Sequence, residues 1–279
     1  MSTDIARWQV LGGTARAARK SVNQDRHDWT VFADGADIAM AVADGHGSAA
    51  YPRSDAGAQF AVDAFLYTAA EFRAALEPDV PLAQVKVRAE EYFPRNLVHE
   101  WRERVGTDLA KNPLREAEQG LEATPVLYGT TLIGAMITGT LVLGWQIGDG
   151  DLCLVGADGQ VSAPLRNPAE TLGDETDSLC SDGAQHLVRT YWAPSPAIDP
   201  PALIALSTDG LSKSFVSFEG YQEFVSGVYQ RIIHDSAGKV SEDLQGWLEQ
   251  ASSYSGDDTT LVAAWQGSPV NPGPEGRPR

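Results

Sequence analysis

Acidic residues in four short turns are the part of this sequence best suited to chemistry. Each turn adjoins an apolar, strand-like run. The turns are VADGHGS, IGDGD, LSTDGLS and SGDDTTL, and they carry Asp44, Asp149, Asp209, Asp257 and Asp258. Carboxylates gathered at one end of a sheet repel one another and would be driven to protonate. A hard divalent cation removes that penalty, and carboxylate oxygens are the ligands that magnesium, calcium and manganese prefer. The turns therefore predict a metal site assembled from distant segments.

A simpler interpretation exists for each turn taken alone, because Asp-Gly pairs are common in hairpin turns. We interpret Asp34-Gly35 and Asp158-Gly159 in that way. The four acidic turns differ as a set, since apolar runs lead directly into three of them and follow the fourth. A sheet that pairs those runs would bring all the carboxylates to one rim.

The bulk composition limits the partners of the chain. It has 279 residues, of which 43% are apolar and 21% charged, as is typical of a globular protein. Its formal net charge is −17, which is unsuited to binding nucleic-acid phosphates or anionic membranes. We expect no nucleic-acid partner and no membrane partner. Any phosphate group must then be attracted by a local cation, which a bound metal would supply.

Three features predict a cytoplasmic protein. The N-terminal segment has no apolar core followed by a cleavage site, so we do not interpret it as a secretory signal. The longest apolar stretch, Gly134 to Ile147, is too short and too rich in Gly and Thr to span a bilayer. Cys153 and Cys180 have no CxxC spacing and no nearby His pair, so we interpret both as reduced thiols.

Short runs bounded by Gly and Asp predict antiparallel strands. The expected strand segments are 31–32 and 38–42, joined by a turn at Asp34-Gly35; a meander over 130–161 that turns at Thr138-Gly139, at 148–150 and at Asp158-Gly159; and the runs 203–206 and 261–265.

Apolar residues recur at helical spacing between these strands. The expected helices cover 58–69 with Ser54 available as a cap, 82–112 with a break or kink at Pro94, 224–232, and a short segment that opens at Ser241. Sheets covered by helices predict an α+β fold. We place one domain at residues 1–266 and expect residues 267–279, rich in Pro and Gly, to form a flexible tail.

The ordered motifs resemble those of a known family. NQD, VADGHGS, GTTL, IGDGD, LSTDGLS and GDDTTLV occur in the order found in the metal-dependent PPM family, the type 2C Ser/Thr protein phosphatases. The resemblance runs from about Ala18 to Trp265, nearly the whole expected domain. NQD and the segment GDETDSLCS, residues 173–181, look most like a bacterial branch of that family.

The resemblance implies a central β-sandwich of two antiparallel sheets flanked by helices on both faces, with two magnesium or manganese ions at one edge. Asp44 would bridge the ions, and the backbone carbonyl of Gly45 would bind one of them. Asp209 and Asp257 would complete the shell of the other ion. Asp149, together with Asp209, matches the place where relatives can hold a weaker third ion.

His46 matches the family residue proposed to protonate the leaving oxygen. Two cations about 4 Å apart lower the pKa of a water and so generate a nucleophile near neutral pH. Phosphate monoesters hydrolyse extremely slowly unaided, so an acid for the departing alkoxide is valuable, and a His beside a metal-binding turn is well placed for that role. The remaining histidines are interpreted as ordinary surface or core residues: His27, His99, His186 and His234.

Two positions near the N-terminus depart from the family pattern. Many relatives hold the substrate phosphate with Arg where this chain has Lys20, with Arg19 beside it. Lysine is a point charge without the bidentate fork, so either residue could supply the grip. The acid that reaches a metal through water in many relatives is Gln24 here, and its neighbour Asp25 either serves structurally or partly replaces it.

A third departure lies in the last motif. The Asn that usually follows the last metal-binding Asp is Asp258 here, so either Asp257 or Asp258 could be the ligand. The position in the motif favours Asp257. None of the departures removes a carboxylate expected to touch an ion.

We therefore expect a magnesium- or manganese-dependent phosphatase that hydrolyses phosphoserine and phosphothreonine in proteins by attack of a metal-activated water. The expected partners are phosphorylated proteins and an opposing Ser/Thr kinase or its targets, and the chain is expected to be a monomer. Two alternatives stay open: a catalytically weak or silent regulator that binds phosphoproteins, and a phosphatase of small phosphate esters. Residues 161–199 form either a flap beside the site, as in relatives, or a long surface connection.

Overall fold

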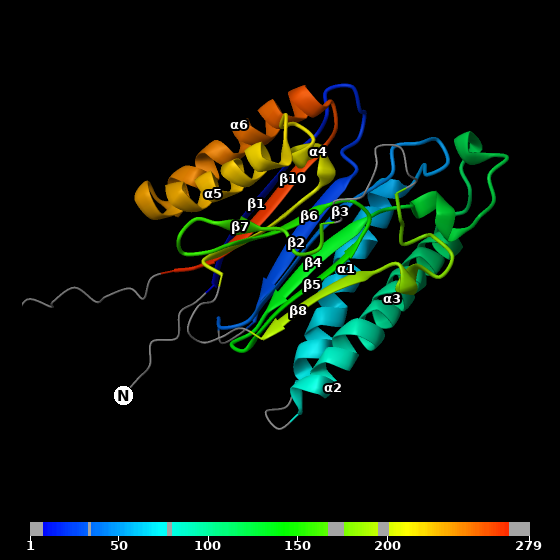
Figure 1. Ribbon diagram of the computed structural model, residues 1–279. Helices are drawn as coiled ribbons and strands as arrows, with labels where there is room; N and C mark the ends of the chain where they lie inside the picture. Colours follow the sequence, from blue (N-terminus) through cyan, green and yellow to red (C-terminus); the bar gives the residue numbers. More distant parts are fainter. Residues whose placement is uncertain (1–7, 33–34, 77–79, 167–175, 195–200, 268–279) are drawn as a thin grey trace, which may run out of the picture.

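Two five-stranded sheets lie face to face at the centre of the molecule, and helices cover their outer sides (Figure 1). The computed structural model describes residues 8–32, 35–76, 80–166, 176–194 and 201–267. All neighbouring strands are antiparallel. The expected α+β sandwich flanked by helices is confirmed.

The strands divide between the sheets as follows. The first sheet has the order β1 (Trp8–Ala15), β10 (Thr259–Gln266), β9 (Leu203–Ser207), β6 (Asp151–Val155) and β7 (Val161–Ser162). The second sheet has the order β2 (Asp25–Val31), β3 (Ile38–Asp44), β4 (Leu132–Ile137), β5 (Leu141–Ile147) and β8 (Arg189–Pro194).

Strand β3 shows how a sequence divides between the two sides of a sheet. Successive side chains of a strand point to opposite faces. Met40 and Val42 pack in the core between the sheets, whereas Ala41 and Ala43 pack in the core beneath the helices. Alanine on the outer side leaves room for helix α1 (Ser54–Ala74), which lies directly against this strand.

Each sheet has its own helical layer (Figure 1). The helices over the second sheet are α1, α2 (Leu82–Val87) and α3 (Phe93–Lys111); those on the side of the first are α4 (Asp209–Ser212), α5 (Phe218–His234) and α6 (Ala237–Ser255). Short 3-10 turns occur at Glu116–Glu118, Pro125–Tyr128 and Ala184–His186. A π-helical turn, Arg88–Tyr92, separates α2 from α3 just before Pro94, so the expected break is confirmed.

Two expected helix starts are wrong. The N-cap position of α1 is Arg53, and the Ser54 hydroxyl instead accepts a hydrogen bond from the Gln24 side chain at 2.7 Å. Helix α6 begins at Ala237 rather than at Ser241. It starts earlier because Ser236 caps it by accepting the backbone N–H of Lys239 at 3.2 Å.

The expected meander is correct as far as β5 and wrong beyond it. Strand β4 pairs with β5, but β6 lies in the other sheet and pairs with β7 and β9. Residues 148–150 are therefore a crossing between the sheets rather than a hairpin turn. Gly148 has a φ of 96° there, in the left-handed region that favours glycine.

Several elements lie outside the expected set or outside the described residues. Strands β1 and β8 are absent from the sequence-based prediction. Asp34 of the expected hairpin turn, parts of the 161–199 stretch and residues 268–279 of the expected tail fall outside the described residues. Within the described part of the chain, none of the helices combines the length and the apolar character needed to cross a membrane. Cys153 and Cys180 are free thiols.

Candidate metal centre

The predicted acidic residues are placed by strand ends at one end of the sandwich. Asp25 begins β2 and Asp44 ends β3, and the two are paired in the register. Asp209 begins α4 just after β9, and Asp258 directly precedes β10. The start of α4 approaches this last turn so closely that a Cβ on Gly210 would lie 2.0 Å from the Asp258 carbonyl oxygen. Carboxylates from distant segments therefore meet at one rim.

Asp44 shows the electrostatic effect of this crowding. Burial raises the pKa of its carboxyl well above the usual range, and the charges of Asp25, Asp209 and Asp257 raise it further. The positive charge of Lys20 lowers it in part. A cation placed among these groups would relieve their repulsion.

Asp25 is buried and only partly satisfied. Its Oδ2 accepts hydrogen bonds from the hydroxyls of Thr208 at 2.8 Å and Thr260 at 2.7 Å. Its Oδ1 is buried and has no hydrogen-bond partner among the described residues. Burial raises the pKa of Asp25 to about 7 against the opposing effect of the two hydroxyls, and the charges of Asp258 and Asp209 add to the rise.

Asp209 is also buried and only partly satisfied. Its Oδ1 is buried without a partner in the described part of the chain, while its Oδ2 contacts the ammonium of Lys213. That ammonium also lies 3.4 Å from Oδ2 of Asp149, on the crossing between the sheets. Burial raises the pKa of Asp209, as does the charge of Asp149, and Lys213 lowers it.

Asp257 and Asp258 differ in what their carboxylates contact. Asp258 accepts the backbone N–H of Ala17 at 2.7 Å and of Gln24 at 2.8 Å. Lys20 contacts Asp257 and lies 3.2 Å from Asp258. Burial lowers the pKa of Lys20, but the hydrogen bond and charge of Asp257, together with the charges of Asp258 and Asp44, raise it by more. Asp257 is thus the residue of the two with an accessible carboxylate.

The other predicted phosphate-binding residue, Arg19, is exposed. A Cβ on Gly256 would lie 3.6 Å from its guanidinium carbon, which places Arg19 at the end of α6 beside the Asp257 turn. Both candidate phosphate-binding cations therefore lie beside the turn that carries Asp257.

The turn that carries Gly45 is packed against the start of α1. A Cβ on Gly45 would lie 2.6 Å from the Ser54 carbonyl oxygen, so no larger residue fits without a backbone shift. The Gln24 carbonyl accepts the N–H of Gly45 at 3.1 Å. The Gln24 side-chain amide donates to the His46 carbonyl at 3.0 Å. Gln24 therefore holds the turn from two sides.

His46 is held at its backbone and at its ring. Its N–H donates to the Gly129 carbonyl at 3.0 Å, and its ring lies 4.8 Å from that of Tyr51, centroid to centroid. A Cβ on Gly129 would lie 2.5 Å from the Tyr51 ring and 2.8 Å from the His46 ring. The glycine of the GTTL motif thus makes room for both rings.

A buried ionic network supports this region, and no motif in the sequence indicates it. Arg53, whose side chain is 1% exposed, pairs with Glu118 at 2.6 Å and donates to the Tyr128 hydroxyl at 2.8 Å. Its backbone N–H donates to the Leu127 carbonyl at 2.9 Å. Hydrogen bonding from Arg53 lowers the pKa of Glu118 to about 2. The network joins the start of α1 to the segment that leads into Gly129.

The residues present fit a magnesium or manganese centre. Among the described residues, no three Asp, Glu, His or Cys side chains already surround one point as ligands. The ammonium groups of Lys20 and Lys213 lie against Asp257 and Asp209 instead. The buried, unpartnered Oδ1 atoms of Asp25 and Asp209 and the accessible carboxylate of Asp257 are nevertheless all oxygen donors. Hard divalent cations prefer such donors.

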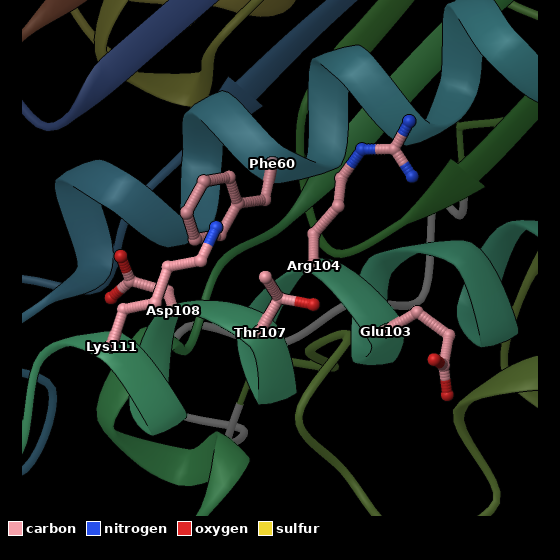
Figure 2. Close-up of a pocket in the computed structure, with 6 residues that line it drawn as sticks. All are labelled: Phe60, Glu103, Arg104, Thr107, Asp108 and Lys111. Carbon is pink, nitrogen blue, oxygen red and sulfur yellow. The ribbon is translucent and has the colours of Figure 1, made fainter.

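A separate hollow of about 330 Å³ lies between α1 and α3, away from these carboxylates (Figure 2). Its lining residues are Phe60, Glu103, Arg104, Thr107, Asp108 and Lys111. It contains none of the predicted site residues, and the side chain of Glu103 points away from the other lining residues (Figure 2). It therefore plays no part in the candidate centre.

Comparisons with solved structures show the same fold. The serine/threonine phosphatase Stp1 of Staphylococcus aureus is 13% identical, with 93% of this chain and 95% of that chain covered and a TM-score of 0.60. The serine/threonine phosphatase PstP/Ppp of Mycobacterium tuberculosis is 16% identical, with 94% and 99% covered and a TM-score of 0.53. The catalytic domain of PstP in complex with 2 manganese ions is 15% identical, with the same coverage and a TM-score of 0.53.

Comparison with curated protein sequences finds no match. The family model described as Protein phosphatase 2C matches residues 12–249, which include all the acidic residues of the rim except the last turn. The match extends over most of both sheets and both helical layers. This chain is therefore a member of the protein phosphatase 2C family.

Proposed function

We propose that this protein is a magnesium- or manganese-dependent phosphatase that hydrolyses phosphoserine and phosphothreonine in proteins. The observation that carries the proposal is the meeting of Asp25, Asp44, Asp209 and Asp257 at one rim, where two buried carboxylate oxygens have no partner among the described residues. Family membership supports the reaction class. The PstP catalytic domain with its 2 manganese ions supports the cofactor.

In this proposal, Asp44 and the Gly45 carbonyl would hold the ions on the side of the second sheet. Asp209 and Asp257 would hold them on the side of the first sheet. When bound, the two ions would activate a water and offset the charge of the phosphoryl oxygens. Every other contribution comes from the side chains and backbone around them.

Three residues act by positioning those ligands. Asp258 fixes the loop before β2 through two backbone N–H groups. Gln24 fixes the turn after β3 through its amide. Asp25, paired with Asp44 in the register, places a second carboxylate behind the first. Their contacts hold the rim in one geometry before substrate arrives.

His46 and the nearby cations act on the substrate. His46 donates a proton to the departing serine or threonine oxygen, in the orientation set by Tyr51 and the Gly129 carbonyl. Lys20 and Arg19 supply positive charge beside Asp257, where the phosphate group enters. An acid for the leaving oxygen contributes typically 10²- to 10⁴-fold to such reactions.

The proposed partners are phosphorylated proteins and an opposing Ser/Thr kinase or its targets. We place the protein, as a monomer, in the cytoplasm. The net charge of −17 supports the absence of nucleic-acid partners, because phosphate backbones need clustered basic residues.

The test is hydrolysis of a phosphothreonine peptide in manganese by the wild type, Asp44→Asn, Asp209→Asn and Asp158→Asn. Asp158 is a matched control, because it is an exposed Asp-Gly residue whose carboxylate accepts the nearby Gln160 N–H at 3.0 Å. We expect roughly 10²-fold or greater losses for the first two variants and none for the control. Equal rates in all four proteins would refute the proposal.

Two further measurements separate the neighbouring functions. Calorimetry that shows tight phosphopeptide binding without turnover would favour a regulator that binds phosphoproteins. A panel in which small phosphate esters react faster than phosphopeptides would favour a small-ester phosphatase. We expect the phosphopeptides to react faster.

A further inference from the structure

Lys213 lies between two carboxylates of the candidate centre. Helix α4 carries Asp209 at its first residue, and Lys213 follows its last, so the two side chains lie four residues apart on one side of the turn. The ammonium contacts Oδ2 of Asp209 and lies 3.4 Å from Oδ2 of Asp149. These two aspartates match the pair that holds a weaker third ion in relatives.

The ammonium of Lys213 therefore places a positive charge between two carboxylates of the candidate centre. A divalent ion between the same carboxylates would meet this positive charge and would have to displace the ammonium from both. Asp209 still keeps its other oxygen, Oδ1, buried and unpartnered in the described part of the chain, for an ion of the main pair.

On the basis of the proposed function, we propose that Lys213 is a built-in third cation. Its ammonium takes the position between Asp149 and Asp209, and the centre therefore holds two divalent ions and excludes a third. Lys213 acts here as a positioning residue that sets the number of ions. We assign it no contact with the substrate.

The chain offers a matched control for this proposal. Lys239 on α6 also lies between two acids, 2.9 Å from Asp243 and 3.7 Å from Glu242, and its side chain is 55% exposed, compared with 59% for Lys213. It lies roughly 24 Å along the helix from the end that adjoins the Asp257 turn. Its removal therefore deletes a similar ion pair far from the centre.

The experiment counts manganese ions by equilibrium dialysis on the full chain after metals are removed with EDTA. The proteins are the wild type, Lys213→Met, Lys213→Gln and Lys239→Met, and circular dichroism checks that each is folded. We expect two ions for the wild type and for Lys239→Met. Both Lys213 variants are expected to bind a third, weaker ion, with a gain in its affinity of at least tenfold. Lys213→Gln gives the answer if the apolar variant does not fold.

A wild type that binds three ions, or Lys213 variants that still bind two, would overturn the inference and leave the proposed function intact. A wild type that binds no manganese would instead refute the proposed function, and the inference with it. Ion counts therefore distinguish the two failures without any measurement of activity.

Discussion

Asp257 and Asp258 are neighbours in the chain, yet their carboxylates have opposite surroundings. The Asp258 side chain is 1% exposed and accepts two backbone N–H groups from the loop before β2. The Asp257 side chain is 40% exposed and faces Lys20 at the rim. One carboxylate therefore fixes a loop, and the other is available to a cation.

Replacing the two residues in turn separates these roles. Asp258→Ala leaves two N–H groups without their acceptor, and each such loss costs about 1–3 kcal/mol, so we expect the free energy of unfolding to fall by about 2–6 kcal/mol. Asp257→Ala should change it by less than about 1 kcal/mol while it weakens manganese binding. Urea denaturation in EDTA measures the first effect, and calorimetric titration measures the second. Equal stability losses would contradict the assignment.

Asp25 predicts how the stability of the metal-free protein depends on pH. Its pKa is raised from 3.8 to about 7, mainly by burial, so the folded state binds a proton that the unfolded state has already released in this range. The contribution of this proton to the free energy of unfolding is fully present below about pH 4 and is lost as the pH rises through 7. Its upper limit is about 4 kcal/mol.

The measurement for Asp25 compares urea denaturation of the wild type and Asp25→Asn in EDTA from pH 4.5 to 7.5. The wild type should lose stability relative to the variant as the pH rises, because the amide that replaces the carboxyl does not titrate. Manganese should reverse the loss for the wild type at pH 7. Parallel pH profiles in EDTA would show that Asp25 ionises normally.

Gly210 and Gly246 make a matched pair of glycines in helices. A Cβ on Gly210 would lie 2.0 Å from the Asp258 carbonyl oxygen, whereas one on Gly246 would have nothing within 4 Å. Gly210→Ala should therefore force the backbone apart and cost about 2 kcal/mol or more, with loss of manganese binding. Gly246→Ala should stabilise the protein by up to about 1 kcal/mol. Thermal melts of both variants test the contrast.

Arg53 and Glu118 form a buried ion pair whose members depend on each other. Arg53→Met leaves the Glu118 carboxylate buried without its partner, and we expect a loss of about 3–5 kcal/mol. The double variant Arg53→Met, Glu118→Leu should lose less than the sum of the single losses, with a coupling of roughly 1–3 kcal/mol. A double-mutant cycle by urea denaturation measures it, and strict additivity would show that the pair is not coupled.

His46 predicts a dependence on the leaving group. An alkoxide needs a proton as it departs, whereas nitrophenolate leaves without one, so the proton donor matters for only one of the two substrates. His46→Asn should lower kcat on a phosphothreonine peptide by about 10²-fold or more and on nitrophenyl phosphate by far less. An equal loss on both substrates would assign His46 a role other than proton donation.

Local sequence patterns predict the strands and helices whose own residues carry the signal. Strands β9 and β10 are apolar runs with an acidic turn at one end, and Pro94 lies in the first turn of α3, directly after the π-helical turn that interrupts the α-helical pattern. Strand β1 escapes prediction because WQVLGGTA contains two glycines and its apolar face is completed only by pairing with β10. The crossing of β6 to the other sheet escapes it for a similar reason, since its partner β9 lies much further along the chain.

Local patterns likewise predict one part of the candidate site, and the other part depends on contacts between distant segments. Residue type and position place Asp44, Asp209 and Asp257 at one rim, because each lies where a predicted strand ends or begins. The pairing of Arg53 with Glu118 joins residues 65 apart in the chain and follows no local rule. Lys213 had a local signal, its spacing of four from Asp209 in LSTDGLSK, but the contact with Asp149 depends on the crossing between the sheets.

The acidic rim draws Asp25 and Asp44 from one sheet, Asp209 and Asp257 from the turns of the other, and Asp149 from the connection between them. A chain in which only one layer has formed presents two of these five carboxylates from that layer. The complete set of carboxylates therefore exists only after the two layers have docked.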